Sequence, residues 1–195
     1  MTIAVFLDRD GTLNVERGYI RDVAQIELIP GAAHAVRRLN DAGMLCVLTS
    51  NQTGAARGYY PLEHIHALNR RVAELLRDEA GARLDAVYFC PHFEGGTVPE
   101  LARSCDCRKP AAGLIYQAAR DFPAIDLQRS WVVGDKATDI AFARNAGCRG
   151  ILVRTGYGED VLSGAYQTLD TQPDAVCADL SEAAAYILRE TALHG

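Results

Sequence analysis

Two aspartates, one residue apart, directly follow a short apolar run near the N-terminus of this 195-residue chain. The run spans residues 3–7, is rich in branched side chains and ends at a polar turn, which is typical of a strand buried on both faces. Asp8 and Asp10 then leave a buried strand together, where two like charges are costly unless a cation or hydrogen bonds compensate them. A divalent metal would compensate them, with one carboxylate as nucleophile and the other as acid and base. The alternative is an ordinary Asx turn after a strand.

Apolar runs alternate with amphipathic stretches along the rest of the chain. The runs that predict strands are residues 3–7, 44–49, 86–89, 131–134, 150–153 and 175–177. The stretches with helical spacing are residues 32–41, 61–80, 111–120 and 138–145, with a last helix from Ser181. This alternation predicts an α/β fold, a Rossmann-like and mostly parallel sheet with helices on both faces. We expect a single domain over residues 1–195, because no linker and no helical insert of cap-domain size is present.

Polar clusters follow the predicted strands at the edge where parallel strands of such a sheet end. Ser50 to Gly54 follows the second strand, and Asp135 and Lys136 follow the fourth. Lys109 precedes a proline and a helix, and Lys109 and Lys136 are the two lysines among 20 basic residues. Taken one at a time, these clusters are also compatible with ordinary turns and a surface lysine. The common place of the clusters after the first, second and fourth strands, at carboxyl ends, favours one shared site.

The Asp-x-Asp-Gly-Thr motif after an N-terminal strand resembles the first motif of the haloacid dehalogenase superfamily of phosphatases. Ser50, Lys109 and the Gly-Asp pair at Asp135 resemble the second, third and fourth motifs. The resemblance implies that Asp8 is the nucleophile, that Asp10 is the general acid and base, and that Ser50 and Lys109 stabilise the phosphoryl oxygens. It also implies catalytic Mg²⁺ held by Asp8, the main-chain carbonyl of Asp10 and Asp135.

A second constellation lies in the aperiodic segment between the third strand and the following helix. Its members are Cys90, His92, Cys105 and Cys107, two short pairs separated by twelve residues. Three thiols and one imidazole in this spacing are a ligand set for structural zinc, and we predict a zinc-stapled loop over residues 90–107. A disulfide or inert buried thiols are the alternatives. Cys46, Cys148 and Cys177 lie near apolar strands and are interpreted as core residues.

This zinc loop, which ends in Arg-Lys-Pro, narrows the resemblance within the superfamily. A capless chain with such a loop resembles the D-glycero-D-manno-heptose 1,7-bisphosphate 7-phosphatases. The resemblance implies hydrolysis of the 7-phosphate through an aspartyl-phosphate, in precursor synthesis for surface polysaccharide. The substrate contacts that it implies are Arg9, Glu16, Arg17, Gly18, Tyr19, Asn51, Gln52, Thr53, Arg57, Arg108 and Lys136. The alternatives are a histidinol-phosphate phosphatase, a phosphatase of another small phosphomonoester, or a zinc-stapled binding module without turnover.

Composition limits the partners and the compartment. The formal net charge of −5 argues against a nucleic-acid binder, which would carry a basic stripe. No run is long and apolar enough to span a membrane, and no basic segment precedes the N-terminal run as in a signal peptide. We therefore expect a monomeric, cytoplasmic protein that acts on a small phosphorylated sugar.

Overall fold

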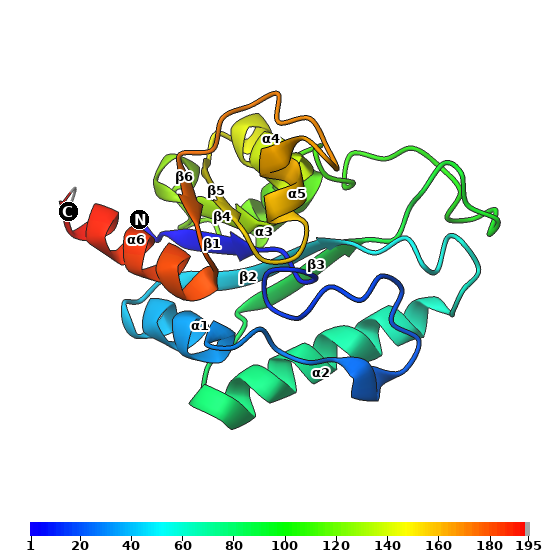
Figure 1. Ribbon diagram of the computed structural model, residues 1–195, viewed down its shortest axis with the longest axis horizontal. Helices are drawn as coiled ribbons and strands as arrows, with labels where there is room; N and C mark the ends of the chain where they lie inside the picture. Colours follow the sequence, from blue (N-terminus) through cyan, green and yellow to red (C-terminus); the bar gives the residue numbers. More distant parts are fainter. Residues whose placement is uncertain (194–195) are drawn as a thin grey trace.

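The structure, a computed structural model that describes residues 1–193, is built on one six-stranded sheet (Figure 1). Every pair of neighbouring strands is parallel, in the order β3-β2-β1-β4-β5-β6. The strands are β1 (Ala4–Leu7), β2 (Leu45–Asn51), β3 (Ala86–Cys90), β4 (Trp131–Gly134), β5 (Arg149–Val153) and β6 (Ala175–Cys177). The predicted Rossmann-like parallel sheet is confirmed.

Helices cover both faces of the sheet, as predicted. The helices are α1 (Ala32–Asp41), α2 (Leu62–Ala80), α3 (Gly113–Asp121), α4 (Ala137–Ala146), α5 (Gly158–Ser163) and α6 (Leu180–Leu193). Buried side chains of α1, α2 and α6 share one core cluster, whereas those of α3 and α4 form a second. Figure 1 accordingly shows α1 and α2 on one side of the sheet and α3 and α4 on the other. The helix α5 packs against α4 through a small third cluster.

The central strand β1 explains why the site lies where it does. Its four residues are completely buried, with Val5 and Leu7 in the first core cluster and Ala4 and Phe6 in the second. A parallel strand covered on both faces requires this near-continuous apolar sequence. Because β2 lies on one side of β1 and β4 on the other, the strand order reverses at β1. Ligands of open α/β sheets bind at such a reversal, beyond the carboxyl ends of the strands.

Several element boundaries differ from the sequence-based prediction. Ser50 and Asn51 belong to the end of β2 rather than to a turn, and Cys90 is the last residue of β3. Ser50 pairs with Phe89 and Asn51 pairs with Cys90, so the pairing of β2 with β3 continues to the ends of both strands. The polar residues at the end of β2 predict a turn there when only the sequence is considered. The six-residue helix α5 has no counterpart in the prediction, because it is too short to show a helical period.

Two long connections surround the carboxyl edge of the sheet. Residues 8–31 contain only the short 3-10 helix η1 (Val23–Gln25), and residues 91–112 contain no helix or strand. Neither connection is a separate cap domain, in agreement with the prediction. A second 3-10 helix, η2 (Leu127–Arg129), lies at the opposite edge, directly before β4.

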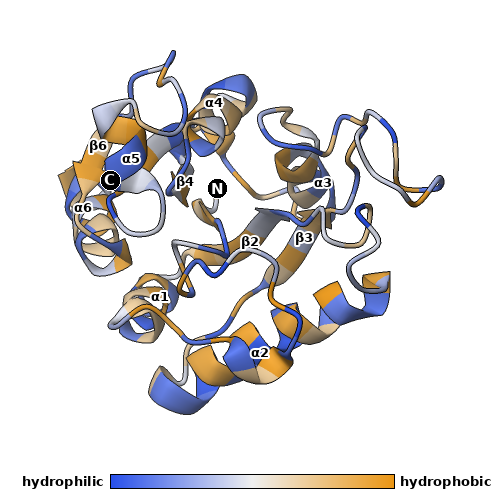
Figure 2. Cartoon of the chain, turned by 45° about the vertical axis from the view of Figure 1, so that its right-hand side comes forward, coloured by the Kyte–Doolittle hydropathy of each residue, from blue (hydrophilic) through white to orange (hydrophobic). Residues whose placement is uncertain are grey.

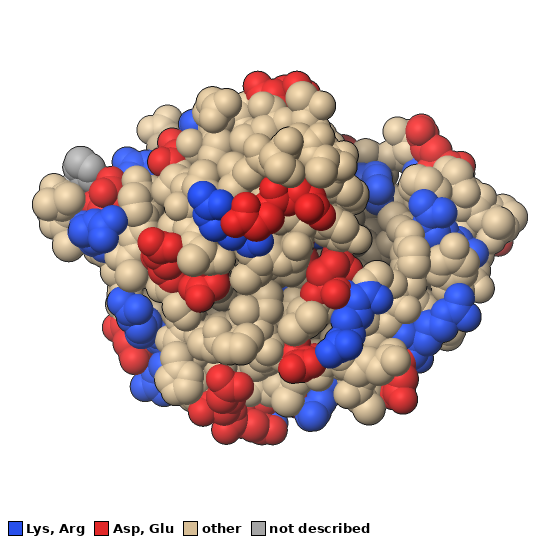
Figure 3. Space-filling view, viewed as in Figure 1, with Lys and Arg blue, Asp and Glu red and all other residues tan. Residues whose placement is uncertain are grey.

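The surface of the helices is polar, as their amphipathic sequences require. Figure 2 shows hydrophobic and hydrophilic residues on different sides of α2. In the part of the chain that the structure describes, none of the helices combines the length and the apolar character of a membrane span. On the face drawn in Figure 3, Lys and Arg are interspersed with Asp and Glu instead of gathering in one patch.

Candidate active site

Three buried carboxylates converge at the carboxyl ends of β1 and β4. Asp8 follows β1, Asp135 follows β4, and Asp139 lies in the first turn of α4. One oxygen from each carboxylate lies within 4.8 Å of the others. Their exposed fractions are 5%, 0% and 1%. Because β1 and β4 are parallel neighbours, residues far apart in sequence meet at one edge of the sheet.

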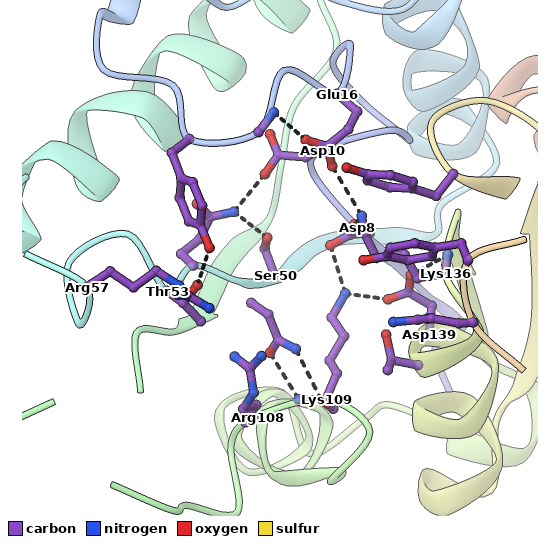
Figure 4. A pocket seen from close by; sticks show the side chains of 18 residues that line it. Asp8, Asp10, Glu16, Ser50, Thr53, Arg57, Arg108, Lys109, Lys136 and Asp139 are labelled. Atoms are coloured by element: carbon purple, nitrogen blue, oxygen red, sulfur yellow. Dashed lines mark hydrogen bonds and ion pairs between the residues drawn. The ribbon is translucent and has the colours of Figure 1, made fainter. Parts of the chain in front are cut away.

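The Lys109 side chain lies between two of these carboxylates (Figure 4). Its Nζ donates hydrogen bonds to Asp8 Oδ1 at 2.8 Å and to Asp139 Oδ1 at 2.7 Å. Burial alone would lower the pKa of Lys109, but Asp139 and Asp8 outweigh burial and raise it above its ordinary value. The side chain is 2% exposed and stays charged. The Asn51 amide fixes the Lys109 main chain through bonds of 3.0 and 3.1 Å to its N–H and carbonyl.

A second lysine lies on the other side of Asp8. Lys136 Nζ is 2.9 Å from Asp135 Oδ1, 3.3 Å from Glu16 Oε2 and 3.9 Å from Asp8 Oδ2. Burial raises the pKa of Asp135 to about 7, although Lys136 opposes that shift. Burial acts to lower the pKa of Lys136, but Asp8 and Asp135 outweigh it and raise the pKa. A further positive charge beside Asp135 would lower this pKa and favour the ionised carboxylate.

Asp10 faces a separate set of donors. Arg9 Nη2 and Gln52 Nε2 each donate to Asp10 Oδ2 at 2.8 Å, and Asn14 Nδ2 donates to Oδ1 at 3.0 Å. Burial would raise the pKa of Asp10, but the Arg9 guanidinium and these hydrogen bonds outweigh burial and lower it. Gln52 Nε2 also donates to Ser50 Oγ at 2.8 Å, so the amide connects Asp10 to the serine at the end of β2.

The threonine of the first motif does not hold a carboxylate. Thr12 Oγ1 is buried and has no hydrogen-bond partner among the described residues, whereas the Asn14 amide bonds to Asp10. Asn14 therefore fixes the rotamer of the Asp10 carboxylate. In a common local turn, the threonine hydroxyl would have this role.

The charges of the inner site fit a divalent cation. Four carboxylates and two lysines form one ion-paired network, and Asp10 and Arg9 form a separate pair, so that five carboxylates face three cations and two negative charges remain. The carboxylates are those of Asp8, Asp10, Glu16, Asp135 and Asp139, and the cations are Arg9, Lys109 and Lys136. One Mg²⁺ would neutralise this excess, and carboxylate oxygens are the hard ligands that it prefers. Asp8 and Asp135 remain the predicted side-chain ligands, and the main-chain oxygen of Asp10 remains the third predicted ligand.

A cavity of about 350 Å³ opens over these residues. The predicted residues that line it are Asp8, Asp10, Glu16, Gly18, Tyr19, Ser50, Asn51, Gln52, Thr53, Arg57, Arg108, Lys109 and Lys136. Two predicted contacts do not line it. Arg9 is 1% exposed and bonds to Asp10 and Asn69, and Arg17 forms an exposed ion pair with Glu27.

Sequence reasoning missed one side of this cavity. Thr138, Tyr157, Tyr166 and Gln167 also line it, the last three from the segment after β5. A weak signal for this segment exists in Gly156 and Gly158, because paired glycines after a strand can mark a close backbone approach. A Cβ on Gly156 would lie 2.2 Å from Asp135 Oδ2, and the Tyr157 N–H donates to the same oxygen at 2.9 Å.

The four predicted zinc ligands meet in one cluster. Cys90 Sγ lies 3.4 Å from Cys105 Sγ, and Cys105 Sγ lies 3.2 Å from Cys107 Sγ. His92 Nδ1 lies 3.4 Å from Cys107 Sγ and 3.8 Å from Cys90 Sγ. Zn–S bonds of about 2.3 Å in a tetrahedron place sulfurs roughly 3.8 Å apart. The cluster therefore fits a closed four-ligand zinc site after a small expansion.

The zinc loop is fastened to the turn after β2. Thr97 N–H donates to the Ala56 carbonyl at 2.8 Å, and the Arg57 guanidinium lies 4.1 Å from the centre of the Phe93 ring. Arg108 lies over the same ring at 5.5 Å. Both arginines line the cavity and are partly exposed, so we call their side of the cavity the mouth. Figure 4 shows them across the pocket from Lys136 and Asp139.

Comparisons with known proteins agree with this arrangement. A protein from Thermosynechococcus vestitus named D-glycero-D-manno-heptose-1,7-bisphosphate 7-phosphatase is 57% identical over 187 residues, 94% of each chain. The chain belongs to this phosphatase family. A family model described as HAD-hyrolase-like matches residues 106–183. The D-glycero-beta-D-manno-heptose-1,7-bisphosphate 7-phosphatase of Escherichia coli strain K12 is 42% identical over 155 residues, 78% of this chain and 80% of its own length.

A solved structure extends the likeness to the fold. The D,D-heptose 1.7-bisphosphate phosphatase from B. bronchiseptica, complexed with magnesium and phosphate, superposes with a TM-score of 0.83. It is 32% identical and covers 97% of this chain and 99% of its own. Mg²⁺ is the cofactor of haloacid dehalogenase phosphatases, in accord with the charge excess of the acidic site, and the Cys/His cluster suits structural zinc.

The close approach of Gly156 to Asp135 can be tested by replacing this glycine with alanine. Gly164 is the control, because a Cβ at that position would meet no other atom within 4 Å. Gly156 and Gly164 have φ values of +60° and +76°, but only Gly156 is crowded. An alanine in this backbone region costs about 1–2 kcal/mol by itself, so Gly164→Ala should lower the free energy of unfolding by that amount and retain activity. Gly156→Ala should be less stable than Gly164→Ala and should lose most activity, since it displaces Asp135. Denaturant unfolding and phosphate release measure both effects, and equal behaviour of the two variants would contradict the contact.

The zinc centre can be tested by metal analysis of cysteine variants. Protein purified without chelator should contain about one zinc per chain, as expected for a closed four-ligand set. Cys107→Ala should lose the zinc and most of the phosphatase activity, because Lys109 lies two residues away. Cys148→Ala, which removes a buried thiol outside the cluster, should keep both. Full activity in zinc-free Cys107→Ala protein would show that the loop positions Lys109 without metal.

Proposed function

We propose that the protein is a Mg²⁺-dependent phosphatase that removes the 7-phosphate of D-glycero-D-manno-heptose 1,7-bisphosphate, in precursor synthesis for surface polysaccharide. The observation that carries this proposal is a buried phosphatase centre and a partly exposed arginine pair that line the same cavity. Asp8 and Lys109 are buried in its inner part, whereas Arg57 and Arg108 line its partly exposed side, the mouth. The relatives named above act on a sugar with two phosphates, by their names.

Asp8 is the nucleophile of the proposed reaction. Its carboxylate attacks phosphorus, the bond between phosphorus and the sugar oxygen breaks, and an aspartyl-phosphate forms. The Lys109 hydrogen bond at 2.8 Å fixes the direction of the carboxylate, and Asp139 fixes the lysine from the other side. When bound, Mg²⁺ would reduce the repulsion between Asp8 and the phosphate and stabilise the developing negative charge.

Asp10 is the proposed general acid and base. It donates a proton to the leaving sugar oxygen and takes a proton from the water that hydrolyses the aspartyl-phosphate. The free enzyme holds Asp10 ionised, because Arg9, Asn14 and Gln52 lower its pKa. A phosphate dianion in the cavity acts in the opposite direction, since a nearby like charge raises the pKa of a carboxyl group. Substrate binding therefore prepares Asp10 to carry the proton.

Positive charge and hydrogen-bond donors surround the place where phosphate oxygens gain charge. Lys109, Lys136 and the Ser50 hydroxyl all line the inner cavity. They are held in place before substrate arrives, by Asp139, Glu16 and the Gln52 amide. Such preorganised groups are the main source of rate enhancement in phosphoryl transfer.

A second phosphate explains the charges at the cavity mouth. The guanidinium groups of Arg57 and Arg108 lie 4.1 and 5.5 Å from the centre of the Phe93 ring, and neither forms an ion pair with a carboxylate of the described residues. Planar guanidinium groups suit bidentate phosphate binding. Histidinol phosphate carries a cation at its far end, which this mouth would repel, so the alternative substrate is not favoured. We also expect the enzyme to act as a monomer, which light scattering can measure.

Removing the nucleophile should stop turnover without unfolding the protein. Asp8→Asn should release no phosphate above background, and Asp10→Asn should be slower by roughly 10²- to 10⁴-fold, the usual contribution of a general acid and base. Asp41→Asn changes an exposed aspartate of α1 and should behave as the unchanged enzyme. Phosphate release from heptose 1,7-bisphosphate, with and without EDTA, measures activity, and circular dichroism checks the fold. Turnover by folded Asp8→Asn at the unchanged rate would disprove the covalent mechanism.

Arg108 should select substrates with a second phosphate. The unchanged enzyme should have a much higher kcat/KM for the heptose bisphosphate than for its 7-monophosphate, because remote binding energy can lower the barrier at the reacting phosphate. Arg108→Ala should reduce this ratio while sparing monophosphate hydrolysis. Arg120→Ala, an exposed arginine of α3 outside the cavity, is the control. An unchanged ratio in Arg108→Ala, or faster hydrolysis of histidinol phosphate than of the bisphosphate, would refute this substrate assignment.

A further inference from the structure

The segment after β5 supplies a wall of the cavity that the reaction described above does not use. Tyr157 and Tyr166 stack with their ring centres 4.3 Å apart and an angle of 14° between the rings. Both rings line the cavity together with Gln167. Tyr166 is 46% exposed, so a large part of its surface is available to a ligand.

The wall is held at a definite place relative to the phosphatase centre. The Tyr157 N–H donates to Asp135 Oδ2 at 2.9 Å, and Lys136 Nζ lies 5.1 Å from the centre of the Tyr157 ring. Gly156 and Gly158 permit this approach, since a Cβ on Gly158 would lie 1.8 Å from the Val153 carbonyl oxygen. The Ala165 and Tyr166 N–H groups both donate to the Asp160 carbonyl, which returns the chain to the stack.

Gln167 carries an unused hydrogen-bonding atom beside the stack. Its Oε1 is buried and has no hydrogen-bond partner among the described residues, although the side chain lines the cavity. A buried acceptor without a donor is unfavourable by about 1–3 kcal/mol, so such atoms point to a missing partner. A hydroxyl group in the cavity could donate to this amide after rotation about its last torsion.

The carbon skeleton of the proposed substrate has a chemistry that matches this wall. The two phosphates are matched by Lys109 and Lys136 at one end and by Arg57 and Arg108 at the other, as proposed above. The carbon skeleton between them presents C–H groups and hydroxyls. Aromatic rings cover C–H surface, and an amide can accept a hydrogen bond from a hydroxyl.

We propose that Tyr157, Tyr166 and Gln167 form a sugar-binding wall that recognises the carbon skeleton of the substrate rather than its phosphates. The proposal rests on the proposed phosphatase function. The stacked rings contact the C–H face of the sugar, and Gln167 Oε1 accepts a hydrogen bond from one of its hydroxyls. The wall sets the preference for a sugar phosphate over a phosphate on a short, flexible alcohol.

The test compares three substrates in three variants. For each enzyme, kcat/KM is measured for heptose 1,7-bisphosphate, for fructose 1,6-bisphosphate and for glycerol phosphate. The sugar ratio is the kcat/KM for a sugar bisphosphate divided by the kcat/KM for glycerol phosphate. Tyr166→Ala should lower the sugar ratio about three- to tenfold, mainly through KM, as expected for the loss of one aromatic contact. Gln167→Ala should lower it by a similar factor, and Tyr166→Phe should leave it unchanged.

Tyr116→Ala is the matched control, because Tyr116 is 45% exposed on α3 and does not line the cavity. Its ratio should equal that of the unchanged enzyme. Equal losses on sugar and glycerol phosphates in Tyr166→Ala and Gln167→Ala, or no loss on either, would overturn the sugar-binding wall. If the unchanged enzyme prefers the fructose bisphosphate to the heptose bisphosphate, the proposed function fails, and the wall is then judged on the fructose ratio alone.

Discussion

The buried Lys109 ammonium, bonded to Asp8 and Asp139, is the interaction on which the rest of the site depends. Removing one member of a buried, hydrogen-bonded ion pair leaves an uncompensated charge, at a cost of about 3–5 kcal/mol. The lysine therefore connects three segments: the end of β1, the end of the zinc loop and the first turn of α4. Each segment is in turn supported by its own contacts, so the nucleophile is oriented before a substrate enters.

Support for Lys109 comes from two directions. The Asn51 side chain bonds both main-chain groups of Lys109, which couples the end of β2 to the lysine. The Cys/His cluster closes the loop that immediately precedes Lys109. In the same loop, the Phe93 ring contacts the guanidinium groups of Arg57 and Arg108. Under the proposed function, a structural metal in this loop would support both ends of the substrate. It would hold the lysine near the reacting phosphate and the arginines near the distant one.

The cavity combines parts that differ in chemistry. Its inner end is charged and balanced for a divalent cation, its mouth carries arginines, and one side is aromatic. A sugar bisphosphate has matching parts: a phosphate at each end and a carbon skeleton with C–H groups between them. Without a cap domain, the loops at the carboxyl edge of the sheet must supply all of this recognition, and the segment after β5 adds the part that the motifs do not contain.

The sequence by itself determined the parallel α/β sheet, the zinc-ligand cluster and the meeting of Asp8, Lys109 and Asp135. Alternating apolar runs, ligand spacing and strand-end motifs are local signals with one common solution. Tertiary structure alone decided that Arg17 turns to Glu27, that Arg9 is buried against Asp10, and that Tyr157 and Tyr166 face the site. Those outcomes depend on side-chain direction and on approaches between segments distant in the chain, which no local pattern encodes.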